Sequence, residues 1–296
     1  MAFLSSSKNH PLAGITLMVV SCLFMASLSV FVKILGQELH PFQVVFLRNF
    51  FSLLLILPLV FTLSKKSLVD TPFKFHIVRS LNGVLAMTVW FYVIARMPLA
   101  DSTAISFTTP LFATLGAVLF LKEKVHFRRW AAICMGFSGV LLMMQPSGDG
   151  GYIMGLLGLL SAVLMAVSTL LIKSLSKTES ARVMLLYMGL FMTPLSFPLA
   201  WAHWQPLTTE QLWLSLAMGA VAALAHLFLN KAFALAEVSA LQPFDFIRLP
   251  IAAMFGYLLF AEIPTLETLL GALIIAGSSI YIGYRESKVK KSAVLS

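Results

Sequence analysis

Residues 12–34 form one unbroken apolar run, LAGITLMVVSCLFMASLSVFVKI, in which Lys33 is the only charged residue. A helix of this length spans the roughly 30 Å of hydrocarbon in a bilayer. The run is too long for the h-region of a secretory signal peptide, and no clean cleavage site of small residues follows it. It therefore predicts a permanent membrane-spanning helix near the N-terminus.

Outward from this run, apolar stretches of similar length recur along the whole chain. Hydrophobic residues make up 59% of the 296 residues and charged residues only 11%, too few to cover the surface of a soluble protein of this length. The predicted spans are 12–34, 42–62, 77–95, 102–121, 128–145, 153–173, 183–202, 211–231, 239–260 and 266–284. The sequence thus predicts an all-α integral membrane protein with ten transmembrane helices.

Lys and Arg residues predict the orientation, because short cytoplasmic loops of membrane proteins carry an excess of them. With ten spans both termini face one side, and this side carries Lys8, Lys65, Lys66, Lys74, Arg79, Lys122, Lys124, Arg128, Arg129, Lys173, Lys177, Arg182, Lys231, Arg285, Lys288, Lys290 and Lys291. The opposite side carries Lys33 and Arg96. We therefore expect a multi-pass protein of the cell inner membrane with cytoplasmic termini and a disordered basic tail over residues 287–296.

The net charge of +9 does not indicate a nucleic-acid-binding protein, because the basic residues lie in short connectors and form no continuous basic face. Cys22 and Cys134 each lie within an apolar run, and neither has a second ligand at a metal-binding spacing. We expect no metal site, no disulfide and no cofactor.

The chain resembles itself at an offset of about 140 residues. The matches are Ser21, Met25, Ala26 and Lys33 with Ser161, Met165, Ala166 and Lys173; Pro58-Leu59 with Pro198-Leu199; Pro110, Gly116 and Phe120 with Pro250, Gly256 and Phe260; and, with small slips, Glu123 with Glu262 and Gly139 with Gly277. The predicted repeats are residues 1–148 and 149–286. Each holds five spans, an odd number, so the second repeat crosses the bilayer in the opposite direction.

Inverted repeats are typical of secondary transporters, whose two halves enclose a central binding site. The alternative is a duplication kept only for packing. Small residues at four-residue spacing, Ala132/Gly136 and Ala272/Ala276, predict close helix contacts, either inside the bundle of a monomer or across a homodimer interface.

The stretch from Leu99 to Glu123, LADSTAISFTTPLFATLGAVLFLKE, resembles the fourth-span signature of EamA-type transporters in the drug/metabolite transporter superfamily. Residues 128–140 continue that pattern and residues 250–262 resemble a second copy of it. The resemblance covers about residues 12–284. It implies a ten-helix carrier with cytoplasmic ends, no ATPase domain and a substrate cavity near the middle of the membrane, between the halves.

Within this family, the Phe107-Thr-Thr-Pro110 form and the stretch from Pro243 to Arg248 look most like the subgroup that includes S-adenosylmethionine and riboflavin carriers. The wider family also moves amino acids, nucleosides and drugs, inward or outward. The resemblance therefore implies a small organic substrate and leaves open its identity and whether the protein imports or exports it.

Ionisable groups inside a span are costly unless they face protein or water, so each is a functional candidate. Arg48, Asp245 and Arg248 are of this kind. Asp245 and Arg248 are three residues apart on one helix face and can pair. Asp245 is a candidate proton acceptor or contact for a substrate ammonium, and the alternative is a structural ion pair. Three prolines predict helix breaks that free backbone carbonyls nearby, at Pro110, Pro243 and Pro250.

Further candidate substrate contacts lie in other spans. Arg48 together with Asn49 could hold a carboxylate or carbonyl, and His226 could relay protons because its ordinary pKa lies near physiological pH. The alternatives are pairing of Arg48 with backbone carbonyls and a packing role for His226. Asn82 and Asn230 either bind substrate or bridge helices, and Trp90 either stacks on a flat ligand or anchors its span.

The favoured function is a secondary carrier of a small molecule, driven by protons or by exchange. A membrane-embedded enzyme would need a catalytic cluster, such as paired His and Glu residues at zinc spacing, and a channel would need rings of like charge or a carbonyl filter. The sequence contains neither pattern.

Overall fold

The structure is a computed structural model, and it describes residues 11–58, 73–121, 127–143, 151–175, 179, 181–235, 241 and 244–294. Within these residues the regular elements are helical and there is no strand, as predicted. The helices are α1 Pro11–Glu38, α2 Pro41–Ile56, α4 Phe73–Arg96, α5 Leu99–Ser106, α6 Thr109–Leu121, α7 Phe127–Met143, α8 Gly151–Leu175, α9 Ala181–Ala202, α10 Thr209–Leu235, α12 Arg248–Phe260 and α13 Leu266–Val294.

Five of these helices are long and apolar enough to cross a bilayer unaided. They contain Leu12–Glu38, Phe73–Arg96, Tyr152–Ile172, Val183–Ala202 and Thr209–Leu229. The apolar segments in α2, α7, α12 and α13 are shorter. Large apolar side chains point outward from several helices, for example Leu141, Trp213 and Leu273, which keep 71%, 64% and 69% of their surface exposed. Such a surface is suited to lipid rather than to water.

The predicted span 102–121 is divided between two helices, because α5 ends at Ser106 and α6 begins at Thr109. Pro110 lies in the first turn of α6, where its missing N–H group leaves no helical hydrogen bond broken. Pro250 likewise lies in the first turn of α12, and residues 244–247 precede that helix as a separate turn. Pro243 lies outside the described residues.

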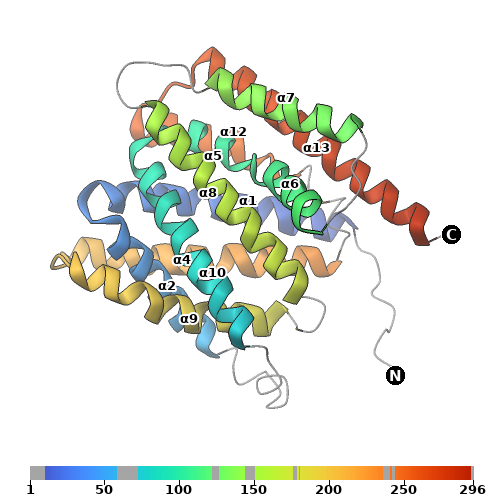
Figure 1. The fold of residues 1–296 in the computed structure, drawn as a ribbon. Helices are drawn as coiled ribbons and strands as arrows, with labels where there is room; N and C mark the ends of the chain where they lie inside the picture. The colour runs from blue at the N-terminus through green and yellow to red at the C-terminus, as the bar shows by residue number, and fades with distance from the viewer. Residues whose placement is uncertain are drawn as a thin grey trace.

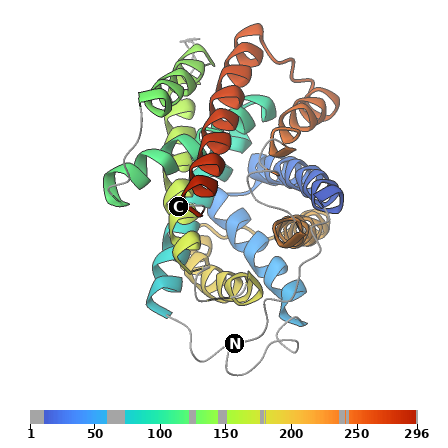
Figure 2. The ribbon, with the colours of Figure 1, turned by 90° about the vertical axis from the view of Figure 1, so that its right-hand side faces the viewer.

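The prediction of a disordered tail is wrong for residues 287–294, because α13 continues as a helix to Val294. Its end leaves the apolar region with lysines and other good helix formers, so the backbone remains helical beyond the hydrophobic segment. The beginning of α1 and the end of α13 lie on the same side of the molecule (Figures 1 and 2).

The helices pack in pairs that join distant parts of the sequence. α1 lies along α10, α8 along α4, and α2 against both α9 and α10. α7 lies beside α13 at one edge of the bundle (Figure 1). The α2–α10 contact is close because Gly219 has no side chain: a Cβ there would lie 2.4 Å from the Cβ of Phe51.

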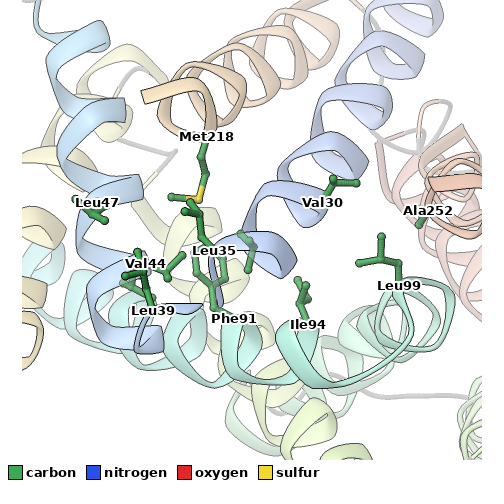
Figure 3. Packing of buried hydrophobic residues seen from close by; sticks show 12 residues of the cluster. Val30, Leu35, Leu39, Val44, Leu47, Phe91, Ile94, Leu99, Met218 and Ala252 are labelled. Atoms are coloured by element: carbon green, nitrogen blue, oxygen red, sulfur yellow. The ribbon is translucent and has the colours of Figure 1, made fainter. Parts of the chain in front are cut away.

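The largest buried cluster is shared between helices from both ends of the chain (Figure 3). It is formed by Val30, Val32, Leu35, Leu39, Val44, Val45, Leu47, Phe91, Ile94, Leu99, Met218 and Ala252. Apart from Leu39, which lies between α1 and α2, these residues come from α1, α2, α4 and α5 and from α10 and α12. Because apolar side chains of both predicted repeats fill one core, the two repeats form a single packed bundle.

Candidate functional site

The two helix interruptions meet inside the bundle. Phe107 lies in the turn between α5 and α6, and Phe246 lies in the turn before α12. Their rings are 4.5 Å apart between centroids and inclined by 51°. Positions where two helices stop short at the same place bring backbone polar groups and helix N-termini together, as in many secondary transporters.

Arg248 spans this junction. Its Nη2 donates to Oγ of Ser106 over 3.1 Å, and its guanidinium lies 5.0 Å from the centre of the Phe107 ring. Nη2 is also 3.8 Å from Oδ2 of Asp245, so the predicted pairing of these two residues is present as a loose ion pair. The side chains of Asp245 and Arg248 keep 37% and 23% of their surface exposed. Both charges are therefore only partly enclosed by protein.

Two buried polar atoms at the junction have no hydrogen-bond partner among the described residues. One is Nε of Arg248 and the other is the hydroxyl of Thr109, at the first position of α6. Native proteins rarely leave such atoms unpaired, and each is expected to find water or a ligand. Ser106, Phe107 and Thr109 were not predicted as site residues, although they belong to the quoted family signature.

The middle of α1 links this junction to a second polar group. The Cys22 thiol lies 3.7 Å from Oδ1 of Asp245, and the hydroxyl of the preceding Ser21 donates to the carbonyl of Ala225 over 2.9 Å. His226 follows Ala225 on α10. Adjacent residues of α1 therefore contact the Asp245 region on one side and the His226 region on the other.

Arg48 is buried on α2 and reaches His226 on α10. Its Nη2 donates to Nε2 of His226 over 2.9 Å, and its Nη1 donates to Oδ1 of Asn49, also over 2.9 Å. A guanidinium has no acceptor, so Nε2 of His226 must be the unprotonated nitrogen in this arrangement. Nε of Arg48 and Nδ2 of Asn49 have no partner within the described chain.

The remaining predicted residues take different places. Asn82 bridges α4 to α8, donating to the carbonyl of Leu164 over 2.8 Å and to the hydroxyl of Ser168 over 2.7 Å. Trp90 packs against the shared apolar cluster. The side chain of Asn230 lies outside the described part of the structure. In the described residues no three His, Cys, Asp or Glu side chains form a metal-binding group.

An ion pair between Lys33 and Glu262 closes one end of the bundle. Lys33 of α1 also donates to the carbonyl of Met97 over 2.6 Å, and the other oxygen of Glu262 accepts from the N–H of Leu99 over 2.8 Å. Ala261 has a left-handed backbone (φ 54°), which turns Glu262 back over α12. Gly256 leaves it room there, since a Cβ would lie 2.7 Å from Oε2.

This pair joins the first predicted repeat to the second, and it was not predicted, because Lys33 was counted only as a charge on the side opposite the termini. A signal was available, because the repeat matches Lys33 with Lys173 and Glu262 with Glu123. Beside the pair, the hydroxyl of Thr268 donates to Oδ1 of Asp101 over 2.8 Å and adds a second link between the repeats.

Three known proteins are similar to this chain over most of its length. The chain is 33% identical over 277 residues to the S-adenosylmethionine uptake transporter of Rickettsia felis, covering 94% of each chain. It is 33% identical over 288 residues to the riboflavin transporter of Vibrio cholerae, covering 96% of this chain and 97% of that one. A solved crystal structure superposes over 90% of this chain and 94% of its own with a TM-score of 0.61; at 15% identity this likeness concerns the fold alone.

The model of the EamA-like transporter family matches residues 12–145 and again residues 152–284. The two matches together cover nearly the whole chain, so the resemblance noted in the sequence is confirmed. With its apolar helices, the chain is a multi-pass membrane protein that transports small molecules and is not an enzyme. It belongs to the EamA-like transporter family.

Proposed function

We propose that this protein is a secondary carrier of the cell inner membrane that moves a small organic metabolite by alternating access. Ten spans form two five-helix halves, residues 1–148 and 149–286, which cross the bilayer in opposite directions and leave both termini in the cytoplasm. The halves rock about the junction of Phe107 and Phe246, so that a site between them opens to one side at a time. The transporting unit is a monomer or a homodimer.

The helix contacts support two related halves. Let α1, α2, α4, α5–α6 and α7 correspond to α8, α9, α10, α12 and α13. Exchanging the halves then converts the α1–α10 contact into the α8–α4 contact, and the α1–α12 contact into the α8–α6 contact. The α2–α9 and α7–α13 contacts are each converted into themselves. These four contacts are preserved by the exchange, which suits a protein whose halves can swap conformations.

The Asp245–Arg248 pair carries the proposal of a substrate. S-adenosylmethionine presents an amino-acid end with an ammonium and a carboxylate, a cationic sulfonium and a flat purine. Nε of Arg248 is free to donate to the carboxylate, Asp245 can accept from the ammonium, and the rings of Phe107 and Phe246 can stack on the purine. Riboflavin has no charges to match the pair. We therefore propose uptake of S-adenosylmethionine.

The other predicted residues keep supporting roles in this proposal. Five predicted substrate contacts remain predictions: Arg48, Asn49, Asn82, Trp90 and Asn230. The amide of Asn82 already donates hydrogen bonds to α8. Asp245 and His226 remain predictions as proton-coupling residues. We favour Asp245, because its side chain is exposed whereas Nε2 of His226 already accepts from Arg48.

Uptake into proteoliposomes tests the proposal, with S-adenosylmethionine, riboflavin, amino acids and nucleosides as probes, with and without a pH gradient. Asp245→Asn is expected to weaken apparent affinity for S-adenosylmethionine about 10- to 100-fold, because a hydrogen bond to a charged group contributes about 1.5–3 kcal/mol. Glu210→Gln, an exposed carboxylate at the start of α10, is the matched control. Undiminished gradient-driven accumulation by Asp245→Asn would show that Asp245 has no such role.

A further inference from the structure

A second ionisable pair lies buried at the opposite end of the bundle from Lys33 and Glu262. Nε2 of His76, near the start of α4, is 2.7 Å from Oε2 of Glu179, which precedes α9. The two side chains keep 0% and 5% of their surface exposed. The transport path proposed above makes no use of this pair, although burying two such groups is costly.

The pair is incompletely hydrogen-bonded. Nδ1 of His76, Oε1 of Glu179 and the hydroxyl of Ser80, one turn further along α4, have no partner among the described residues. Each unpaired buried atom costs about 1–3 kcal/mol relative to hydration. With the imidazole neutral and donating from Nε2 to the carboxylate, Nδ1 retains a free lone pair. A proton can therefore bind to Nδ1, or to Oε1 with neutralisation of the carboxylate.

Neighbouring groups determine how an added proton changes the net charge of this buried cluster. Arg79, also on α4 and buried, donates to the carbonyl of Met184 over 3.3 Å and contacts the sulfur of Met188. Tyr187 of α9 lies 4.9 Å from His76, ring to ring. With Arg79 charged, Glu179 ionised and His76 neutral, the cluster has no net charge. An added proton leaves an uncompensated positive charge in a poorly hydrated place, which water would have to enter to stabilise.

The pair also joins the two halves. His76 and Arg79 belong to the first half, whereas Glu179 and α9 belong to the second. Phe73 of α4 packs edge-on against Tyr187 of α9 at 5.5 Å, which adds an aromatic contact between the same two helices. A change in the strength of the His76–Glu179 contact therefore acts on the interface that must open during transport.

We propose that His76 and Glu179 form a proton-binding site at the cytoplasmic end of the interface between the halves, and that its occupancy sets the rate of substrate exchange. This inference rests on the proposed carrier function and the proposed orientation. The site is separate from Asp245, and it acts even when substrate is equal on both sides and no proton gradient drives net transport.

The experiment measures exchange of labelled S-adenosylmethionine, with riboflavin as a second probe, at equal concentrations across a proteoliposome membrane. The pH at the cytoplasmic face is varied from about 5.5 to 8, around the ordinary pKa of His, while the other face is held constant. Over this pH range the exchange rate of the wild type is expected to change about fivefold or more, which is the lower end of typical coupling between two sites. His76→Gln and Glu179→Gln are expected to flatten the profile to within about twofold.

His203→Gln, an exposed histidine at the other end of the bundle, should keep the wild-type profile. The proton site is wrong if His76→Gln and Glu179→Gln retain the wild-type dependence. A wild type that exchanges at a rate independent of cytoplasmic pH also overturns it, while leaving the carrier function intact. Failure of the wild type to exchange either probe contradicts the proposed function instead. In that case the proton site is tested by thermal unfolding in detergent at several pH values. Loss of the site in His76→Gln must change the slope of the unfolding free energy against pH.

Discussion

Replacing Glu262 by Gln is expected to favour opening of the bundle end that the Lys33–Glu262 pair closes. The side chains of Lys33 and Glu262 keep only 7% and 16% of their surface exposed. Removing one partner of a buried ion pair costs about 3–5 kcal/mol, because the other charge remains buried without compensation. The amide oxygen introduced by Glu262→Gln can still accept from the Leu99 N–H, so we take the lower figure of about 3 kcal/mol. At about 1.4 kcal/mol per decade, this multiplies the open population roughly 100-fold.

Thiol labelling measures that population. Thr103 is 4% exposed and lies one turn beyond Leu99 on α5, between the ion pair and Ser106. In a background without the two native cysteines, Cys22 and Cys134, Thr103→Cys should react slowly with a membrane-impermeant maleimide added outside. Glu262→Gln should raise the rate about 100-fold, since labelling follows the fraction of open molecules when opening is fast.

Matched variants separate opening from general damage. Glu210→Gln removes an exposed carboxylate at the start of α10 and should leave labelling unchanged. Lys33→Gln should reproduce the effect of Glu262→Gln, and the double variant should add little, because both remove one interaction. Labelling of a folded Glu262→Gln protein within threefold of wild type refutes the reasoning. The repeat supplies a further check: Glu123→Gln, at the position equivalent to Glu262, should lower outside labelling if the halves exchange roles.

Two other predictions concern packing and pH. Gly219→Ala would place a Cβ 2.4 Å from the Cβ of Phe51 and 2.9 Å from backbone atoms of Phe51 and Ser52. We expect it to lower the free energy of unfolding by about 1–3 kcal/mol, measured by thermal unfolding. Gly277→Ala, where a Cβ meets nothing within 4 Å, should be nearly neutral. His40 lies in the connection between α1 and α2, and its ring stacks on that of His203 at 4.2 Å. Partial burial lowers the pKa of His40, and the nearby His203 and Arg96 lower it further. The folded state therefore disfavours protonated His40, and its stability should be complete above about pH 6.5 and decline below it, less steeply in His40→Gln. A steeper decline in the variant would contradict this sign.

Sequence reasoning worked best where the physical cause is local. Apolar run length predicted α1, α4, α8, α9 and α10 within a few residues, because a helix that crosses a bilayer must satisfy its backbone internally. The pairing of Asp245 with Arg248 was also predictable from their separation of three residues, although a turn at residues 246–247 interrupts the expected continuous helix between them.

Contacts between distant residues could not be predicted in this way. In sequence, Lys33 and Glu262 are separated by 229 residues. The separation is 178 residues for Arg48 and His226, and 103 residues for His76 and Glu179. Each contact depends on which helices become neighbours, and apolar composition is too uniform to encode that choice. The charge count assigned Arg79 to the side of the termini, whereas it lies in the second turn of α4 and is 9% exposed.

The placement of the charges has a physical reason in a protein that must open. In a static bundle, buried ion pairs contribute little, and apolar residues of similar volume stabilise as well or better. Apolar contacts that separate in water lose their whole contribution, whereas separated charges are rehydrated and recover much of theirs. Contacts that form and break in each cycle are therefore better made by charged pairs, and contacts that persist by apolar ones. Lys33–Glu262 and His76–Glu179 join the halves at opposite ends of the bundle, while the rings of Phe107 and Phe246 form an apolar contact at the junction of the halves. This division assigns motion to the two polar ends and leaves the Phe107–Phe246 junction as the part about which they move.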